Sequence, residues 1–341
     1  MTSVPGEPLL EVRDLVKSFP IRRTVLQALR RTPRRAVHAL NGVSLTVRRG
    51  ETLGIVGESG CGKSTFARCL VRLIEADAGT IAYGGVDVRR LAGLGRRAFN
   101  RRVQLIFQDP YGSLNPRMTV RQTLAEPLRV HGLRAATGIP ARIAELLDLV
   151  HLPRDALDRY PHEFSGGQRQ RIGIARALSV EPECLIADEL VSALDVSVQA
   201  QVINLLLELQ ERLQLTVLFV AHDLRLVRHI SHRVAVMYLG RIVELAETER
   251  LFSNPSHPYA RALLSAAPEL DPTRRSRTAA VRGELPSPVA IPPGCPFHPR
   301  CPHAFETCYR ERPALIRREG GSIAACHLVA PVPAEAASPD S

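Results

Sequence analysis

The chain has 341 residues, of which 45% are hydrophobic, so it can bury the cores of about two domains, or of one large domain with an appendage. Its formal net charge of +11 invites a nucleic-acid partner, but aromatic residues make up only 4% and tryptophan is absent, so surfaces on which bases stack are scarce. No apolar run approaches the ~18 residues that span a bilayer, and residues 1–8 lack the layout of a signal peptide. We therefore expect a cytoplasmic protein that binds no nucleic acid and carries its arginines on solvated faces.

The N-terminal part of the chain is predicted to form strands around a glycine-rich loop. Alternating apolar residues predict one strand within residues 9–19 and another over residues 43–47. The arginine-rich residues 20–35 form a predicted surface insertion between them. The apolar run 53–56 is typical of a buried strand, and residues 65–74 have helical spacing. The apolar side of that helix holds Phe66, Leu70, Leu73 and Ile74.

Between this strand and this helix lies the pattern glycine, four residues, glycine, lysine and serine or threonine, which is a phosphate-binding P-loop. Glycines let the backbone turn tightly and point its N–H groups at an anion, and the free N–H groups at the helix start favour negative charge. Lys63 would reach the β- and γ-phosphates, and the hydroxyl of Ser64 would bind Mg²⁺. The predicted nucleotide-binding residues of the loop are Gly57, Ser59, Gly60, Cys61, Gly62, Lys63, Ser64 and Thr65.

The alternative, a glycine-rich turn without a ligand, is disfavoured by composition. Lys17 and Lys63 are the only lysines among the 45 lysine and arginine residues. A chain that uses arginine almost everywhere still places lysine at the phosphate position, which chance explains poorly.

The middle of the chain predicts a strand pair, a polar strand end and a helical insert. Residues 80–88 are expected to form two short strands around a glycine turn. Residues 103–107 predict a strand that stops before a proline, so Gln108 would project from the strand end into a loop. Residues 119–159 have helical spacing and predict a helical insert between two halves of the sheet.

A second glycine pair precedes the next predicted helix. Residues 165–168 read Ser-Gly-Gly-Gln, and residues 169–178 are rich in helix formers. A glycine pair ahead of a helix makes a second anion site. Considered alone, this stretch fits a simple helix start equally well.

Two later strands also end in polar side chains. Residues 184–189 form an apolar strand that ends in Asp188 and Glu189, and residues 216–221 form a buried strand that leads to His222. Beside a P-loop, the first carboxylate suits Mg²⁺ and the second can polarise a water molecule. Solvated turn residues are the alternative, but ligands of open α/β sheets bind at such strand ends.

Four of the seven cysteines cluster near the C-terminus. Three others, Cys61, Cys69 and Cys184, are scattered through segments that already have another role. In a cytosolic protein, a cysteine cluster binds metal more often than it forms disulfides. The clustered residues are Cys295, Cys301, Cys308 and Cys326.

In their order and spacing, these motifs resemble the nucleotide-binding subunit of an ATP-binding cassette (ABC) transporter over residues 9–265. The matching motifs are the P-loop, the Gln108 loop, residues 165–168, the Asp188-Glu189 pair, residues 192–195 and His222. The resemblance implies an α/β fold: an ABC-type P-loop NTPase domain over residues 1–265, with a mixed sheet core and a helical subdomain at about residues 110–180.

The resemblance also implies roles for matching residues, with ATP and Mg²⁺ as cofactors. Ser64, Gln108 and Asp188 would serve Mg²⁺. Glu189 would be the base or polariser of the attacking water, and His222 would contact the γ-phosphate. The implied catalytic residues are therefore Glu189, His222 and Gln108.

Other matching residues would complete the nucleotide contacts. Phe19 would stack on adenine, and Asp195 belongs to the implied nucleotide-binding set. In this family Ser165 and Gly167 close over the ATP of a second subunit, so a monomer should hydrolyse ATP poorly. Their neighbours Gly166 and Gln168 belong to the same motif.

The chain departs from the family pattern at two positions. Phe164 stands where leucine is common, and an apolar exchange should be tolerated. Leu190 stands where proline usually follows the second carboxylate, which loosens a backbone constraint on the loop of Glu189. Because both carboxylates are present, we expect less precise positioning rather than loss of hydrolysis.

The C-terminal part, residues 266–341, resembles the extension of peptide-importing ABC subunits. The resemblance rests on residues 254–259, which read Asn-Pro-Ser-His-Pro-Tyr, and on the cysteine-containing stretch 294–302. The cysteine spacing is wider than in most zinc sites. Spacing and resemblance together favour a [4Fe–4S] cluster held by the four clustered cysteines. Zn²⁺ is the alternative, with His298, His303 or His327 as a substitute ligand, and free thiols are a third interpretation.

The resemblance implies an ATPase subunit that powers uptake of oligopeptides or dipeptides. Its expected partners are a second ATPase subunit, favoured to be a paralogue, two transmembrane permeases and an extracytoplasmic solute-binding protein. It would therefore work at the cytoplasmic face of the membrane. The alternatives are uptake of nickel chelates or glutathione, a non-transport ABC ATPase of DNA repair or translation, and a subunit that binds ATP without hydrolysing it.

Overall fold

The main sheet combines parallel and antiparallel strands. The computed structural model describes residues 6–21, 35–266, 283–318 and 321–328. Eight strands of these residues form a sheet in the order β11-β12-β10-β9-β3-β8-β7-β6. Its parallel part consists of β9 (Arg233–Tyr238), β3 (Thr52–Val56), β8 (Thr216–Val220), β7 (Cys184–Asp188) and β6 (Val103–Ile106). The predicted mixed α/β sheet is confirmed.

The central parallel strands read as apolar runs because both of their faces are covered. Every residue of β3, β7 and β8 is buried. Side chains alternate between two separate cores: Val217 and Phe219 of β8 point into one, and Leu218 and Val220 into the other. The sheet thus carries a separate apolar layer on each face.

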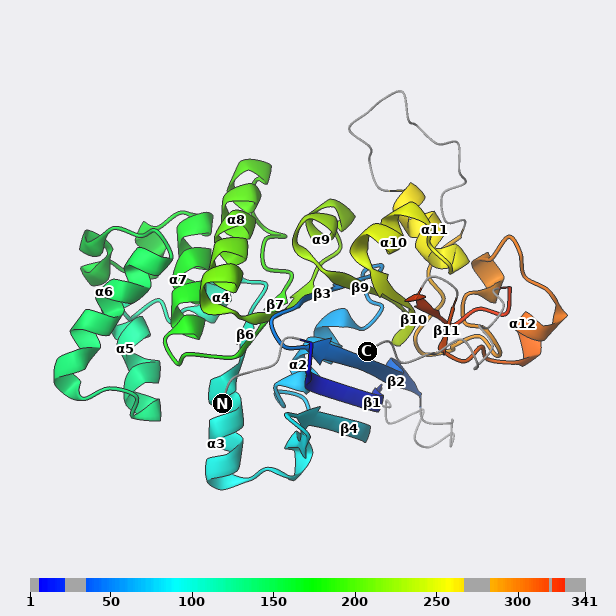
Figure 1. Ribbon diagram of the computed structural model, residues 1–341, viewed down its shortest axis with the longest axis horizontal. Helices are drawn as coiled ribbons and strands as arrows, with labels where there is room; N and C mark the ends of the chain where they lie inside the picture. The colour runs from blue at the N-terminus through cyan, green and yellow to red at the C-terminus, as the bar shows by residue number, and fades with distance from the viewer. Residues whose placement is uncertain (1–5, 22–34, 267–282, 319–320, 329–341) are drawn as a thin grey trace, which may run out of the picture.

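One of these layers is closed by a small antiparallel sheet of order β2-β1-β4-β5. Its strands are β1 (Pro8–Pro20), β2 (Ala36–Arg48), β4 (Ala78–Tyr83) and β5 (Val86–Asp87). Figure 1 shows this sheet and α2 (Lys63–Leu70) on one side of the main sheet. The helices α8 (Val196–Leu213), α9 (Leu224–Ile230), α10 (Thr248–Ser253) and α11 (Pro258–Ser265) lie on the other side.

The predicted helical insert follows β6 and lies at one end of the molecule (Figure 1). It contains α4 (Pro110–Ser113), α5 (Val120–His131), α6 (Ile139–Leu149) and α7 (Gly166–Leu178). Helix α5 starts with a capping box, in which the Thr119 hydroxyl accepts from the Gln122 N–H and the Gln122 side chain accepts from the Thr119 N–H. The apolar side chains of these helices belong to the same core as α8.

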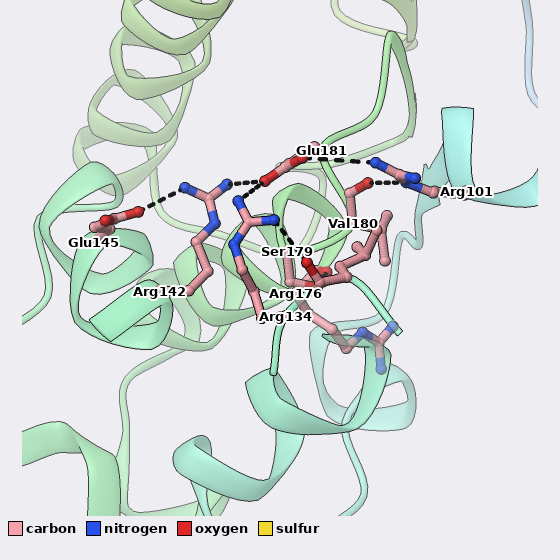
Figure 2. A network of polar contacts seen from close by, with 9 residues as sticks. Arg101, Arg134, Arg142, Glu145, Arg176, Ser179, Val180 and Glu181 are labelled. Carbon is pink, nitrogen blue, oxygen red and sulfur yellow. Dashed lines mark hydrogen bonds and ion pairs between the residues drawn. The ribbon is translucent and has the colours of Figure 1, made fainter. Parts of the chain in front are cut away.

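Glu181, in the loop between α7 and β7, connects the insert to the rest of the domain (Figure 2). Its carboxylate contacts Arg134 and lies 3.9 Å from Arg142 of the insert. On the other side it lies 3.6 Å from Arg101 of α3 (Gly93–Arg102). Arg101 also donates to the carbonyl of Val180. One carboxylate therefore bridges arginines from separate segments.

The C-terminal region packs on the domain at the end opposite the insert (Figure 1). The short strand β12 (Ile323–Ala324) pairs with β10 (Arg241–Glu247), and β11 (Ile316–Arg317) pairs with β12. Helix α12 (Glu306–Arg310) lies in the same region. The described part of the extension thus adds strands to the main sheet. No helix in the described ranges combines the length and the apolar character needed to cross a bilayer.

Two details differ from the expected elements. Helix α2 ends at Leu70 rather than near residue 74, and Leu73 is 59% exposed instead of lying on the buried side. The chain turns there because Arg72 has a φ of 56°, which is outside the helical region. Strands β9 and β10, which extend the sheet beyond the P-loop strand, were not predicted.

Candidate nucleotide-binding site

The P-loop lies between β3 and α2 and contacts both sheets. Gly62 has a φ of 110°, and a Cβ there would lie 2.3 Å from the carbonyl oxygen of Ala39 on β2. A Cβ on Gly57 would lie 2.2 Å from the carbonyl oxygen of Met237 on β9. The backbone approaches its neighbours so closely that glycine is required at both positions. Tight packing of the loop therefore follows directly from the predicted glycines.

The side chain of Lys63 is folded against its own loop. It is 4% exposed, and Nζ donates to the carbonyl oxygens of Gly57 at 2.8 Å and Glu58 at 3.2 Å. The ammonium group thus lies inside the loop where phosphate oxygens would replace these carbonyls as acceptors. Ser59, Gly60, Cys61 and Thr65 complete the loop and the start of α2.

Ser64 and Asp188 form a pair that is suited to a divalent cation. The Ser64 hydroxyl donates to Oδ1 of Asp188 at 2.8 Å. Asp188 ends β7, is 1% exposed, and burial raises the pKa of its carboxyl. A bound cation would relieve the cost of a buried negative charge, and hydroxyl and carboxylate oxygens are ligands that Mg²⁺ prefers. The predicted partnership of these two residues is present.

Gln108, Glu189 and His222 meet at the ends of neighbouring strands. Nε2 of Gln108 donates to Oε2 of Glu189 at 2.8 Å, and Nδ1 of His222 lies 3.9 Å from the same oxygen. The residues follow β6, β7 and β8, which are adjacent in the sheet. Because these strands are parallel, their carboxyl ends share one edge, as in other ligand sites of this fold class.

The loop after β7 is held by hydrogen bonds although it lacks proline. Glu189 has a φ of 49°, and its N–H donates to the carbonyl of Val220 at 2.9 Å. The N–H and the hydroxyl of Ser192 both donate to the carbonyl of Glu189, at 3.1 and 3.0 Å. Leu190 is 1% exposed and packs in the apolar core. Leucine at this position therefore contributes apolar packing to the loop.

Residues 165–168 begin α7 with a capping box. The Ser165 hydroxyl accepts from the Gln168 N–H, and Oε1 of Gln168 accepts from the Ser165 N–H. A Cβ on Gly167 would lie 2.3 Å from Val198 in the first turn of α8, and one on Gly166 would lie 3.0 Å from Leu194. Asp195 is the residue at the start of α8. The glycines thus let the start of α7 pack closely against residues 194–198.

Phe19 lies on the small sheet beside the strand that contacts the P-loop. It pairs with Val37 of β2, two residues before Ala39, whose carbonyl abuts Gly62. Its ring is 37% exposed, and the Lys17 ammonium lies 5.4 Å from the ring centroid. The exposed ring is available for stacking.

The four clustered cysteines lie close enough for Cys295 to be affected by the other three. Burial, together with the nearby Cys308, Cys326 and Cys301, raises the pKa of Cys295 to about 11. Across the ranges that the structure describes, no group of three or more His, Cys, Asp or Glu side chains is arranged to hold a metal ion. The predicted ligand set of Cys295, Cys301, Cys308 and Cys326 is therefore not supported by this geometry.

Two contacts to the P-loop were not predicted. Tyr259 of α11 and Arg300 of the C-terminal part contact Glu58 of the loop. Residues 254–259 and 294–302 stand out in the sequence only for their resemblance to a family. Contacts across such separations leave no local signal in the spacing of residues.

The strand–loop–helix unit, its buried lysine and the carboxylates at the strand ends define a P-loop nucleotide-binding protein. Residues 40–192 match the family described as ABC transporter, and residues 243–308 match the C-terminal region of oligopeptide/dipeptide transporters. The putative oligopeptide transport ATP-binding protein YkfD of Bacillus subtilis is 51% identical, over 94% of this chain and 95% of that protein. The oligopeptide transport ATP-binding protein AppF of the same organism is 49% identical, over 96% and 99%.

Solved structures show the same cassette. The ATP-binding cassette MJ0796, solved as a dimer in a post-hydrolysis state with ADP and Pi, has a TM-score of 0.61 and 25% identity, over 70% of this chain and 98% of that one. The cbiO1 protein of Clostridium perfringens has a TM-score of 0.61 at 24% identity, over 73% and 92%, which bears on the fold alone. This chain belongs to the ABC transporter family, as an ATPase subunit of its oligopeptide and dipeptide branch.

Proposed function

We propose that this chain hydrolyses ATP to power the uptake of oligopeptides or dipeptides through a membrane transporter. One observation carries the proposal: the Ser64–Asp188 pair and the Gln108–Glu189–His222 group lie at adjoining strand ends beside the P-loop. The names of the relatives supply the class of solute. Phosphoryl transfer depends mainly on positioning and charge neutralisation, which these groups can provide.

The residues divide the work of binding and hydrolysis. Lys63 and the loop N–H groups would hold the phosphates, while Ser64 and Asp188 would hold Mg²⁺, which neutralises phosphate charge when bound. Because Nε2 of Gln108 donates to Glu189, its amide oxygen is the group suited to the cation. Glu189 would accept a hydrogen bond from the attacking water, and His222 would contact the γ-phosphate.

The partners follow from the family. We infer that Ser165 and Gly167 close over ATP on a second ATPase subunit, a paralogue in our proposal. The start of α7 would then face the phosphates of that ATP. Two permeases and an extracytoplasmic solute-binding protein would complete the transporter. The chain would then work at the cytoplasmic face of the membrane, and the Gln108 loop and helical insert would transmit the motion.

We also propose a [4Fe–4S] cluster on Cys295, Cys301, Cys308 and Cys326, with Zn²⁺ as the alternative. The clustering of these cysteines in the sequence and their proximity in the fold support this proposal. Anaerobic purification followed by iron, sulfide and zinc analysis tests it. About four irons with matching sulfide per chain, lost in Cys301→Ser, are expected for the cluster. Zinc without sulfide would favour the alternative, and neither metal would contradict both.

The decisive test of hydrolysis is Glu189→Gln in the chain assembled with its permeases. We expect ATP binding to persist and turnover to fall at least about 100-fold, because the amide cannot accept a proton or polarise water as a carboxylate does. Glu249→Gln, which removes an exposed carboxylate on α10, is the matched control and should keep normal turnover. Wild-type turnover in Glu189→Gln would contradict the assignment. Absence of turnover in the wild-type complex would favour a subunit that only binds ATP.

A further inference from the structure

Glu58 of the P-loop is bound from outside the loop by Tyr259 of α11 and by Arg300 of the C-terminal part of the chain. Nη1 and Nη2 of Arg300 donate to the two carboxylate oxygens of Glu58, at 2.8 and 2.9 Å. The N–H of Glu58 donates to the hydroxyl oxygen of Tyr259 at 3.0 Å. The Arg300 side chain is 6% exposed and Tyr259 is fully buried. Both the side chain and the backbone of Glu58 are therefore fixed.

The geometry of these contacts is that of a strong and directional interaction. Two parallel N–H···O bonds between guanidinium and carboxylate fix the orientation of both groups, which a single ammonium cannot do. Because Arg300 is withdrawn from water, salt screens the pair less than it screens an exposed pair.

Fixing Glu58 also fixes the groups that hold Lys63. The Lys63 ammonium is bound by the carbonyls of Gly57 and Glu58, which belong to the same stretch of backbone. Between Glu58 and Lys63 the loop passes through Gly60, where a Cβ would meet no atom within 4 Å. Ser59 and Gly60 form an exposed tip, whereas Cys61 is buried, so the shape of the tip depends on the contacts on either side of it.

Tyr259 is held in place by the residues that precede it. The buried carboxylate of Glu244 accepts the N–H groups of Ser256 and His257, both at 2.7 Å. Nδ1 of His257 in turn accepts the N–H of Tyr259 at 3.0 Å and caps α11. The hydrogen bonds within residues 254–259 and to Glu244 thus fix the position of Tyr259, which contacts the P-loop.

Arg300 is held in place by an aromatic cluster. Phe297 precedes the short turn that contains Arg300, and its ring lies 5.4 Å from those of Tyr238 and Tyr259, between centroids. The rings of Tyr238 and Tyr259 lie 4.6 Å apart. The cysteine-containing stretch 295–301 is therefore in continuous contact with the P-loop through buried side chains.

We propose that Arg300 and Tyr259 are positioning residues that hold the P-loop in its phosphate-binding shape, so that the C-terminal region sets the affinity of the site for MgATP. The proposal rests on the proposed ATPase function. A loop that is already ordered loses less conformational freedom when the phosphates bind, and the affinity rises accordingly. The contacts lie away from the residues proposed to act on water, so they should affect binding more than the chemical step.

Calorimetric titration of the full chain with MgATP tests the proposal. We expect Arg300→Met to raise the Kd about five- to tenfold, a typical size for coupling between adjoining sites. Arg300→Lys should lie between Arg300→Met and wild type, because it keeps the charge and loses the two-pronged contact. Tyr259→Phe should also raise the Kd, since it removes the acceptor and keeps the ring. Arg310→Met, which removes an exposed arginine paired with Glu306 in the same region, is the matched control and should bind normally.

A double-mutant cycle separates positioning from general loss of structure. Glu58→Gln should raise the Kd by a similar factor, and Glu58→Gln with Arg300→Met should be no worse than either alone. In the assembled complex, Arg300→Met should raise KM for ATP and leave kcat nearly unchanged. Unchanged Kd values in Arg300→Met and Tyr259→Phe, or fully additive effects in the cycle, would overturn the proposal. If Arg300→Met fails to fold, Arg300→Lys and Tyr259→Phe carry the same test. A wild-type chain that does not bind MgATP would instead overturn the proposed function.

Discussion

The two sides of the P-loop are built differently. On the side of the strand ends, Nε2 of Gln108 donates to Glu189 at 2.8 Å and to the Ser192 hydroxyl at 3.4 Å. Nδ1 of His222 lies 3.9 Å from Glu189, and the His222 side chain is 58% exposed. On the opposite side, Arg300 and Tyr259 bind Glu58 at 2.8 to 3.0 Å from an almost fully buried aromatic cluster. The histidine at the strand ends is thus exposed to water, whereas the arginine and the tyrosine that contact Glu58 are buried.

This contrast predicts that the buried rings around Phe297 contribute more to the free energy of unfolding than exposed side chains do. Phe297→Ala removes a ring that is 2% exposed and packs against three other rings. We expect it to lower the free energy of unfolding by about 3–5 kcal/mol. Urea unfolding measures the change. Phe305→Ala, at a ring that is 39% exposed, is the control and should cost less than about 1 kcal/mol. Equal losses in the two variants would contradict the contrast.

The support of Tyr259 should also make stability depend on pH. Burial lowers the pKa of His257 to about 3, whereas the unfolded chain ionises histidine near pH 6.5. Between these values only the unfolded state binds the proton. The contribution of His257 to the free energy of unfolding is therefore fully present above about pH 6.5 and falls as the pH drops toward 3. The slope contributed by one such group is at most about 1.4 kcal/mol per pH unit.

Comparison with His257→Gln isolates that contribution. Glu244 affects the free energy of unfolding in the opposite direction. Burial raises the pKa of its carboxyl, so the fold favours the protonated form. The free energy of unfolding that Glu244 contributes therefore falls as the pH rises. Glu244 is present in both proteins. We expect thermal unfolding between pH 4 and 7 to show a flatter pH dependence in His257→Gln. Parallel curves would show that His257 ionises normally in the folded state.

The smallest effect is expected at the exposed end of the helical insert. Glu181 contacts several arginines, but its side chain is 36% exposed, so water and salt screen the network. Glu181→Gln should lower the free energy of unfolding by about 0.5–1 kcal/mol in low salt, measured by urea unfolding. The difference from wild type should shrink in 1 M NaCl, where screening is stronger. A loss that is independent of salt would assign the effect to packing instead.

The sequence predicted the two sides of the P-loop unequally. Lys63, Ser64 and Asp188 were predictable because a glycine pattern and an apolar strand ending in a carboxylate are local signals. The pairing of Arg300 with Glu58 spans 242 residues, and neither residue type nor spacing identifies the partner. Leu73 was misplaced because apolar spacing continued past the point where Arg72 ends the helix. Local patterns thus identified the side that binds phosphate, and the side that supports it depends on tertiary contacts.

The side of the strand ends should govern turnover, and the side of Tyr259 and Arg300 should govern the affinity for ATP. Steady-state ATPase rates of the assembled complex, measured over a range of ATP concentrations for Glu189→Gln and Arg300→Met, test it most directly. We predict that Glu189→Gln loses kcat and keeps ATP binding, whereas Arg300→Met raises KM and keeps kcat. If both variants change the same parameter by similar factors, the two sides do not divide these roles and the account is wrong.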